Sequence, residues 1–309
     1  MSREVVELML ETPAGLLVDG TVGGGGHAAL LLEARQDWQY LAIDRDSDAL
    51  LAARSRLARF GDRVEFVQSE FANLAEIAGD RGKVVGILLD LGVSSPQLDR
   101  PERGFAYRYD APLDMRMDTR CGLTAAIVVN EYSEELIASL IMHNGEERFA
   151  RRIAREIVRR RPLLTTTDLV EAITTAIPAP ARRRGGHPAK RTFQAIRMEV
   201  NRELPNLVEC LDESVHLLAD KGRILVLAYH SLEDRIVKER FVKWAGGDKS
   251  TPQAPSKLPV DERQLIDMQT DERLVRILTR KPLRPKPAEI SANRRAENAR
   301  LRCAERAVS

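Results

Sequence analysis

The sequence of 309 residues lacks the features that mark secreted, membrane-spanning and zinc-stabilised proteins. Its three cysteines are far apart and form no CxxC pair, so neither a disulfide framework nor a zinc site is expected. No apolar run is long enough to cross a bilayer, and the N-terminus lacks the basic-then-apolar layout of a secretory signal. No internal repeat is found. We therefore expect a cytoplasmic protein with no bound metal and no membrane partner.

The formal net charge of +2 hides an uneven distribution along the chain. Residues 148–202 contain 14 Lys and Arg against 4 Asp and Glu, a local excess of +10, whereas the remaining residues carry −8. This asymmetry indicates a segment that faces a polyanion such as a nucleic acid. A solvated helical face rich in arginine is the alternative explanation.

Short apolar runs alternate with helical patterns at the start of the chain, which predicts a parallel sheet with helices on both faces. The expected strands are residues 16–19, 40–44, 64–68 and 84–91. The pattern is helical over most of 123–201, and strand patterns return at 223–229 and 274–279. A basic helix or partial disorder is expected at 293–306. The sequence thus predicts an α/β sheet interrupted by a helical insert.

Four consecutive glycines, 23–26, follow the first strand and open a helix, as in loops that hold a nucleotide-like ligand. No lysine follows them, so the loop is not a P-loop. A nicotinamide dinucleotide would place its pyrophosphate beside Asp19, which would repel it. S-adenosylmethionine has no phosphate, and its ammonium and sulfonium groups attract a carboxylate. Asp44, at the end of the second strand, suits the ribose hydroxyls of either cofactor, so Asp19 decides for S-adenosylmethionine.

A second polar motif, residues 90–99, follows the fourth strand and should face the glycine loop across a cleft, because ligands bind outside the carboxyl ends of parallel strands. With this motif, the chain resembles the RsmH (MraW) family of bacterial small-subunit rRNA cytosine-N4 methyltransferases along nearly its whole length. The resemblance rests on residues 19–27, 90–97, 103–118, 145–150, 187–194 and 230–238.

The resemblance implies a Rossmann-like class I S-adenosylmethionine methyltransferase with an inserted helical domain. The methyltransferase domain would comprise residues 1–110 and 200–309, and the substrate-recognition insert residues 111–199. The implied substrate is a cytosine near the P site of 16S rRNA in the 30S subunit. The implied cofactor contacts are Gly25, Gly26, His27, Asp44, Phe71, Asp90 and Gln97. Family members usually begin with a longer segment, which suggests a start codon placed late here, and the C-terminal tail matches the family pattern only in part.

The cytosine amine is a poor nucleophile, because its lone pair is delocalised into the ring, so acceptors must hold its N–H groups. The candidate catalytic residues are Asp90, Ser94, Ser95 and His230, of which His230 is equally well explained as a helix cap. Glu233 and Asp234 should reach the same rim of the cleft. The sequence marks no residue as a general base.

Aromatic and basic residues are the candidates for RNA binding, because rings stack on splayed bases and cations pair with phosphates. They are Arg103, Phe105, Tyr107, Arg182, Arg183, Arg184, Lys190 and Arg191. The alternative for the aromatic segment, residues 103–110, is a loop folded onto the core of the insert. A nicotinamide-dependent oxidoreductase and a non-catalytic RNA-binding assembly factor are the competing functions. The oligomeric state, a dimer included, is left open.

Overall fold

The computed structural model describes residues 1–182, 186–246 and 273–308. Its centre is a seven-stranded sheet in the order β3-β2-β1-β4-β5-β7-β6. The strands are β1 (Gly15–Asp19), β2 (Trp38–Asp44), β3 (Val64–Gln68), β4 (Val84–Asp90), β5 (Leu218–Ala228), β6 (Val275–Ile277) and β7 (Arg300–Arg306). The first five are parallel, and β7 runs antiparallel to both of its neighbours. The first four strands and β5 therefore agree with the sequence-based expectation to within a few residues.

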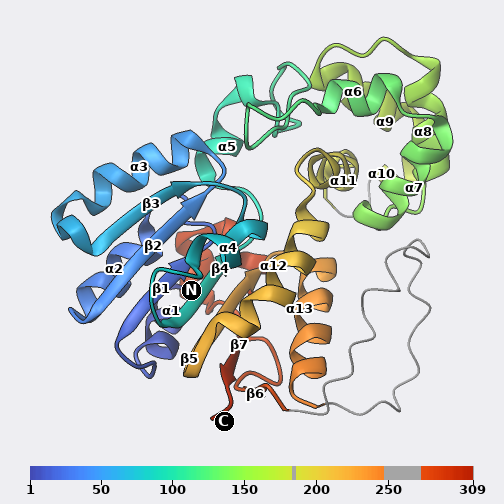
Figure 1. Cartoon of the computed structure of the whole chain (residues 1–309). Helices are drawn as coiled ribbons and strands as arrows, with labels where there is room; N and C mark the ends of the chain where they lie inside the picture. The colour runs from blue at the N-terminus through green and yellow to red at the C-terminus, as the bar shows by residue number, and fades with distance from the viewer. Residues whose placement is uncertain (183–185, 247–272, 309) are drawn as a thin grey trace.

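Helices cover both faces of the sheet (Figure 1). One face packs against α1 (Ser2–Met9), α2 (Gly26–Ala34) and α3 (Ser47–Leu57), and the other against α4 (Leu74–Ala78), α12 (Glu203–Leu217) and α13 (Ser231–Trp244). Strand side chains alternate between the two cores: Leu16 and Val18 point to one, and Leu17 to the other. Of the seven residues of β4, only Asp90 is not buried, as expected for a central parallel strand.

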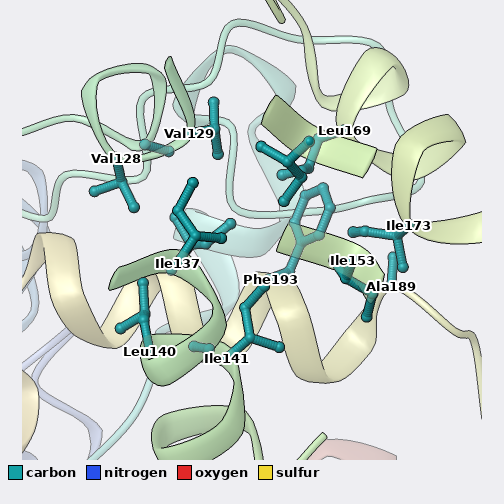
Figure 2. Packing of buried hydrophobic residues seen from close by; sticks show 14 of the residues in the cluster. Val128, Val129, Ile137, Leu140, Ile141, Ile153, Leu169, Ile173, Ala189 and Phe193 are labelled. Atoms are coloured by element: carbon teal, nitrogen blue, oxygen red, sulfur yellow. The ribbon is translucent and has the colours of Figure 1, made fainter. Parts of the chain in front are cut away.

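Between β4 and β5 the chain leaves the sheet and forms the helical part at the upper right of Figure 1. After α5 (Ser95–Asp99) come α6 (Ala125–Glu131), α7 (Glu134–Gly145), α8 (Ala150–Arg159), α9 (Thr166–Ala176), α10 (Ala179–Arg182) and α11 (Lys190–Val200). They enclose an apolar core of their own, in which Phe193 packs among aliphatic side chains from several of these helices (Figure 2). Among these helices, α8 is strongly amphipathic, and Thr165 caps α9 with a capping box.

The C-terminal tail corrects the sequence-based expectation. Residues 293–306 were expected as a basic helix or partly disordered, but after α14 (Pro287–Ala292) and a 3-10 turn at Arg294–Asn298 they form β7, between β5 and β6. The charged residues of this segment did not indicate a strand in the sequence. In the structure they are paired inside the fold, since Arg302 donates to Asp234 and Glu305 accepts from Arg223. No helix among the described residues combines the length and the apolar character needed to span a bilayer.

Candidate active site

A cavity of about 260 Å³ lies at the carboxyl ends of the central strands, where parallel sheets bind ligands. It is lined by Asp19, Gly20, Thr21, Val22, Gly23, Gly24, Gly26, His27, Asp44, Arg45, Ala49, Phe71, Asp90, Leu91, Gly92, Val93, Ser94, Gln97, Met117, Glu203, Leu207, Tyr229 and Glu233. The cavity thus joins the glycine loop to the motif after β4, as the sequence predicts. Met117 adds a residue from the segment that leads into the helical part.

The glycine loop needs its glycines for two different reasons. Gly23 and Gly25 have φ of 51° and 74°, a left-handed conformation that favours glycine. Gly24 lies on the cavity, and a Cβ there would meet no atom within 4 Å, so its backbone is open to a ligand. Gly25 precedes α2 and packs against Leu57 instead of lining the cavity. Gly25, one of the implied cofactor contacts, therefore shapes the loop and does not itself line the cavity.

Two carboxyl groups flank this loop, of which Asp19 is buried and Asp44 is half-buried. Asp44 accepts the backbone N–H groups of Gly23 and Asp46, both at 2.9 Å, and burial raises its pKa to about 6. Asp19 accepts the Tyr40 hydroxyl at 2.7 Å and the Thr21 N–H at 3.0 Å, and burial raises its pKa to about 6 as well. Because burial disfavours the ionised form of each carboxyl, a ligand that offers a hydrogen-bond donor or a positive charge would be bound favourably here.

Asp90 lies opposite the glycine loop and has both carboxylate oxygens engaged. Its Oδ1 accepts the Tyr229 hydroxyl at 2.8 Å, and its Oδ2 lies 3.5 Å from His27 Nε2. Burial alone would lower the pKa of His27, but the hydrogen bond and charge of Asp90, together with the charge of Asp19, raise it. The Thr21 hydroxyl accepts the Asp90 backbone N–H at 2.6 Å. These contacts fix the carboxylate at the rim of the cavity.

Gln97 and Ser94 form the turn that begins α5. The Gln97 Oε1 accepts the Ser94 N–H at 2.9 Å, and the Gln97 Nε2 donates to Asp46 Oδ2 at 2.8 Å, with Gln97 only 6% exposed. Both residues line the cavity, so both stay candidates for ligand contact in addition to their capping role. The backbone of Ser95 belongs to α5, and its side chain lies outside the described part of the structure.

His230 does not line the cavity. It is the residue before α13, and its Nδ1 accepts the Glu233 N–H, so the structure shows the helix cap that was the alternative to a catalytic role. Two acids that do line the cavity, Glu203 and Glu233, lie beside it. Sequence reasoning placed Glu233 at the rim but gave it no role, and it missed Glu203 and Tyr229 altogether.

Glu203, His230 and Glu233 have ligand atoms within 4.8 Å of one another, a spacing that suits a metal ion. Two contacts oppose that use. Glu203 accepts two N–H groups of Arg197 at 2.7 Å each, so its charge is already balanced. The His230 Nδ1 is an acceptor, which assigns the ring proton to Nε2, the nitrogen that would have to bind the ion. The pairing of Glu203 with Arg197 therefore makes this group a poor site for a metal ion.

Two of the expected RNA-binding residues are packed inside the protein instead. Phe105 is 6% exposed and belongs to the core of the helical part, because the aromatic segment folds onto that core. Arg103 donates to Asp46 at 2.9 Å and to the carbonyls of residues 116 and 117. Both positions are thus corrected to structural roles. Tyr107 stacks on His187, with ring centroids 4.3 Å apart.

The other basic candidates lie on the helical part. Arg182 and Lys190 are exposed, at the end of α10 and the start of α11. Arg191 is also exposed, donates to the Glu146 carbonyl at 3.1 Å and lies 3.8 Å from Glu147. Arg183 and Arg184 lie outside the described residues.

The sheet order, the cavity and its carboxylates define a Rossmann-like methyltransferase of the class that uses S-adenosylmethionine. The chain belongs to the MraW methylase family, whose model matches residues 1–307. The resemblance noted from the motifs is thereby confirmed.

Curated relatives named "Ribosomal RNA small subunit methyltransferase H" are similar over almost the entire chain. The protein of Symbiobacterium thermophilum is 48% identical over 97% of this chain and 93% of its own length. That of Thermobifida fusca is 49% identical over 99% and 92%. Among solved structures, an rRNA methylase from Streptococcus thermophilus is 11% identical, with a TM-score of 0.42 over 99% of this chain and 95% of that one.

Proposed function

We propose that this chain transfers a methyl group from S-adenosylmethionine to the exocyclic N4 amine of a P-site cytosine in 16S rRNA of the 30S subunit. The observation that carries the proposal is that the glycine loop, Asp44 and Asp90 meet in one cavity. The names of the curated relatives support a small-subunit rRNA substrate. The cytosine amine is the acceptor that the family resemblance implies.

The cavity suits S-adenosylmethionine in charge and in shape. Asp44 would hold the ribose hydroxyls, since each of its oxygens keeps a lone pair beside the backbone N–H that it already accepts. Phe71 and Leu207 offer apolar surface for adenine. The His27 Nδ1 is buried and has no hydrogen-bond partner in the described structure, so a polar ligand atom would satisfy it. When bound, the cofactor supplies a reactive methyl group on a cationic sulfur.

The protein's own contribution is to align the acceptor amine with that methyl group. Alignment of two reactants can supply several kcal/mol of the barrier reduction. Asp90 is oriented by Tyr229 and His27 at the cavity rim, where it can accept an N–H of the cytosine amine. The target base must leave its stack to arrive there, and the helical part would hold the surrounding RNA.

Cofactor affinity should depend on pH through Asp44 and Asp19, since burial raises the pKa of each carboxyl in the cavity to about 6. At that pKa, roughly a tenth of each carboxyl is ionised at pH 5 and nearly all at pH 7.5. A protonated Asp44 holds ribose less well, and the raised pKa of His27 adds positive charge to the cavity at low pH. Calorimetry should therefore show S-adenosylmethionine binding that is weaker by at least about tenfold at pH 5 than at pH 7.5. Equal affinities at the two pH values would contradict the assignment of Asp44.

Phosphate contacts should come from exposed cations of the helical part. Replacing both Arg182 and Lys190 by alanine should weaken 30S binding and flatten the slope of log affinity against log salt by roughly 1 to 2, since each lost phosphate contact removes about 0.7–0.9. The measurement is a salt titration of binding. Arg81→Ala, which breaks an exposed pair with Glu65 on the methyltransferase part, is the control and should leave the slope unchanged. An unaltered slope in the double variant would remove these residues from the interface.

The proposed reaction is tested by nucleoside mass spectrometry of 16S rRNA from cells that lack this protein. Loss of an N4-methylcytidine species, with all other modifications retained, is the expected result. If a different methylated nucleoside were lost, the chain would still be an rRNA methyltransferase, but the proposed acceptor, the cytosine N4 amine, would be wrong.

A further inference from the structure

Glu233 is a buried acid in the wall of the cavity, and the alignment described above gives it no role. It is 2% exposed and is the third residue of α13. Its Oε2 accepts the backbone N–H groups of Tyr229 at 2.9 Å and His230 at 3.4 Å. These two bonds hold the carboxylate where β5 ends. A burial this complete is costly for a carboxylate unless its hydrogen bonds or its function compensate for it.

Two other carboxylates in the wall of the cavity, those of Asp90 and Glu203, already have close partners. Asp90 takes the Tyr229 hydroxyl on one oxygen and faces His27 with the other. Glu203 is paired through both oxygens with Arg197. A carboxylate paired with a guanidinium binds a proton poorly, because the cation stabilises its ionised form. Glu203 is therefore poorly suited to take a proton from a substrate, and Asp90 already has the role of orienting the amine.

Glu233 differs from both. Its Oε1 lies 3.0 Å from His230 Nε2, and this is its one ion-pair neighbour among the described residues. The His230 ring lies against Glu233 with both nitrogens: Nδ1 accepts the Glu233 N–H at 3.4 Å, and Nε2 lies beside Oε1 without a hydrogen bond of good geometry. Within the described part of the chain, Glu233 thus has no guanidinium group hydrogen-bonded to it, although Arg197 is close enough for its charge to interact with that of Glu233. The Tyr229 residue links the two sides of the cavity, since its hydroxyl binds Asp90 and its backbone N–H binds Glu233.

We propose that Glu233 is the proton acceptor of the methyl transfer and that His230 is a positioning residue that holds it. The inference rests on the proposed function, because it assumes an amine as the methyl acceptor. Asp90 would orient the amine, and Glu233 would take the proton that the amine must lose.

The proton balance of the step requires such a group. The lone pair of the acceptor nitrogen forms the new N–C bond, and the electrons of the broken S–C bond stay on sulfur, which becomes neutral. The nitrogen then carries one proton too many, and this proton passes to the Glu233 carboxylate. The resulting carboxylic acid returns the proton to solvent when product leaves. Proton transfer to a positioned group contributes typically about 10²–10⁴-fold to a rate.

The test is Glu233→Gln. Glutamine keeps the capping box of α13 and can still accept the Tyr229 N–H, but it cannot take a proton. We expect single-turnover methylation of unmodified 30S subunits to slow by about 10²-fold. Affinity for S-adenosylmethionine by calorimetry should stay close to that of the parent protein, and the melting temperature should fall only modestly, because the amide nitrogen replaces the oxygen beside His230 Nε2. The matched control is Glu239→Gln, an exposed acid on the same helix, which should change none of the three.

His230→Asn retains a side-chain cap for α13 but removes the Nε2 contact with Glu233. It should slow the single-turnover rate about tenfold with cofactor affinity unchanged. A purely structural role would instead lower the melting temperature and leave the chemical step intact.

The outcomes separate this inference from the proposed function. If the wild-type enzyme forms N4-methylcytidine and Glu233→Gln does so at a near-normal rate, Glu233 is not the acceptor and the function stands. If the wild-type enzyme methylates a carbon or a hydroxyl instead, the proposed function fails first. A slowed Glu233→Gln with weakened cofactor binding would also overturn the inference, because it would make Glu233 a cofactor ligand.

Discussion

Replacing Asp90 by alanine should slow methylation by at least about 10²-fold, because this carboxylate is the group best fixed to align the acceptor amine. Tyr229 and His27 hold its two oxygens at the rim of the cavity, and Thr21 anchors its backbone. Alanine removes the acceptor and leaves the Tyr229 hydroxyl without its partner. The measurement is single-turnover methylation of unmodified 30S subunits at saturating S-adenosylmethionine, which isolates the chemical step from cofactor binding.

Asp99→Ala is the control from the same motif. Asp99 is exposed and pairs with Arg295 away from the cavity, so its loss should leave the rate unchanged. The methylation rate of Tyr229→Phe should lie between those of Asp90→Ala and Asp99→Ala, since this variant removes one contact of Asp90 and keeps the carboxylate. A near-normal rate for Asp90→Ala would reduce Asp90 to a binding residue.

The parallel strands could be predicted from the sequence because their apolar runs are continuous. The β4 run is apolar on both alternations, and the structure buries it on both faces. The position of the site followed from topology, since the residues after β1, β2 and β4 must meet at one edge. The strand β7 could not be predicted in this way. Its arginines and glutamate resemble a surface segment until their partners Asp234 and Arg223 are brought in from distant parts of the chain.

Within the site, sequence reasoning found the residues that belong to local motifs and missed those that arrive through tertiary packing. Glu203 follows the helical part and carries no motif of its own, yet the fold places it in the cavity wall. For the aromatic segment, sequence reasoning made the opposite error, because it predicted a binding role for residues that the fold buries. Rings interleaved with arginines resemble an RNA-stacking surface, but Phe105 is needed to fill the core of the helical part, and Arg103 is needed to pair with Asp46. Burial separates these uses, and a sequence does not display burial.

Replacing Asp44 by alanine should weaken S-adenosylmethionine binding by at least about 10²-fold while altering folding much less. A carboxylate that holds two ribose hydroxyls makes two charge-assisted hydrogen bonds, each worth about 1.5–3 kcal/mol. The structure adds a second reason: Asp44 also holds the N–H of Gly23, so its loss loosens the loop that the cofactor must contact. Calorimetric titration of the free enzyme with S-adenosylmethionine measures the affinity, and thermal unfolding measures the fold.

Asp44→Asn separates the two contributions. The amide oxygen can still accept the Gly23 N–H, but the side chain has lost its charge and one of its two acceptor atoms. If ribose binding dominates, asparagine should weaken the affinity nearly as much as alanine; if loop order dominates, it should restore most of the affinity. Asp48→Ala is the control, since Asp48 is exposed, pairs with Arg100 and does not line the cavity. An affinity loss below about threefold in Asp44→Ala would exclude the ribose contact, because even one charge-assisted hydrogen bond exceeds that value.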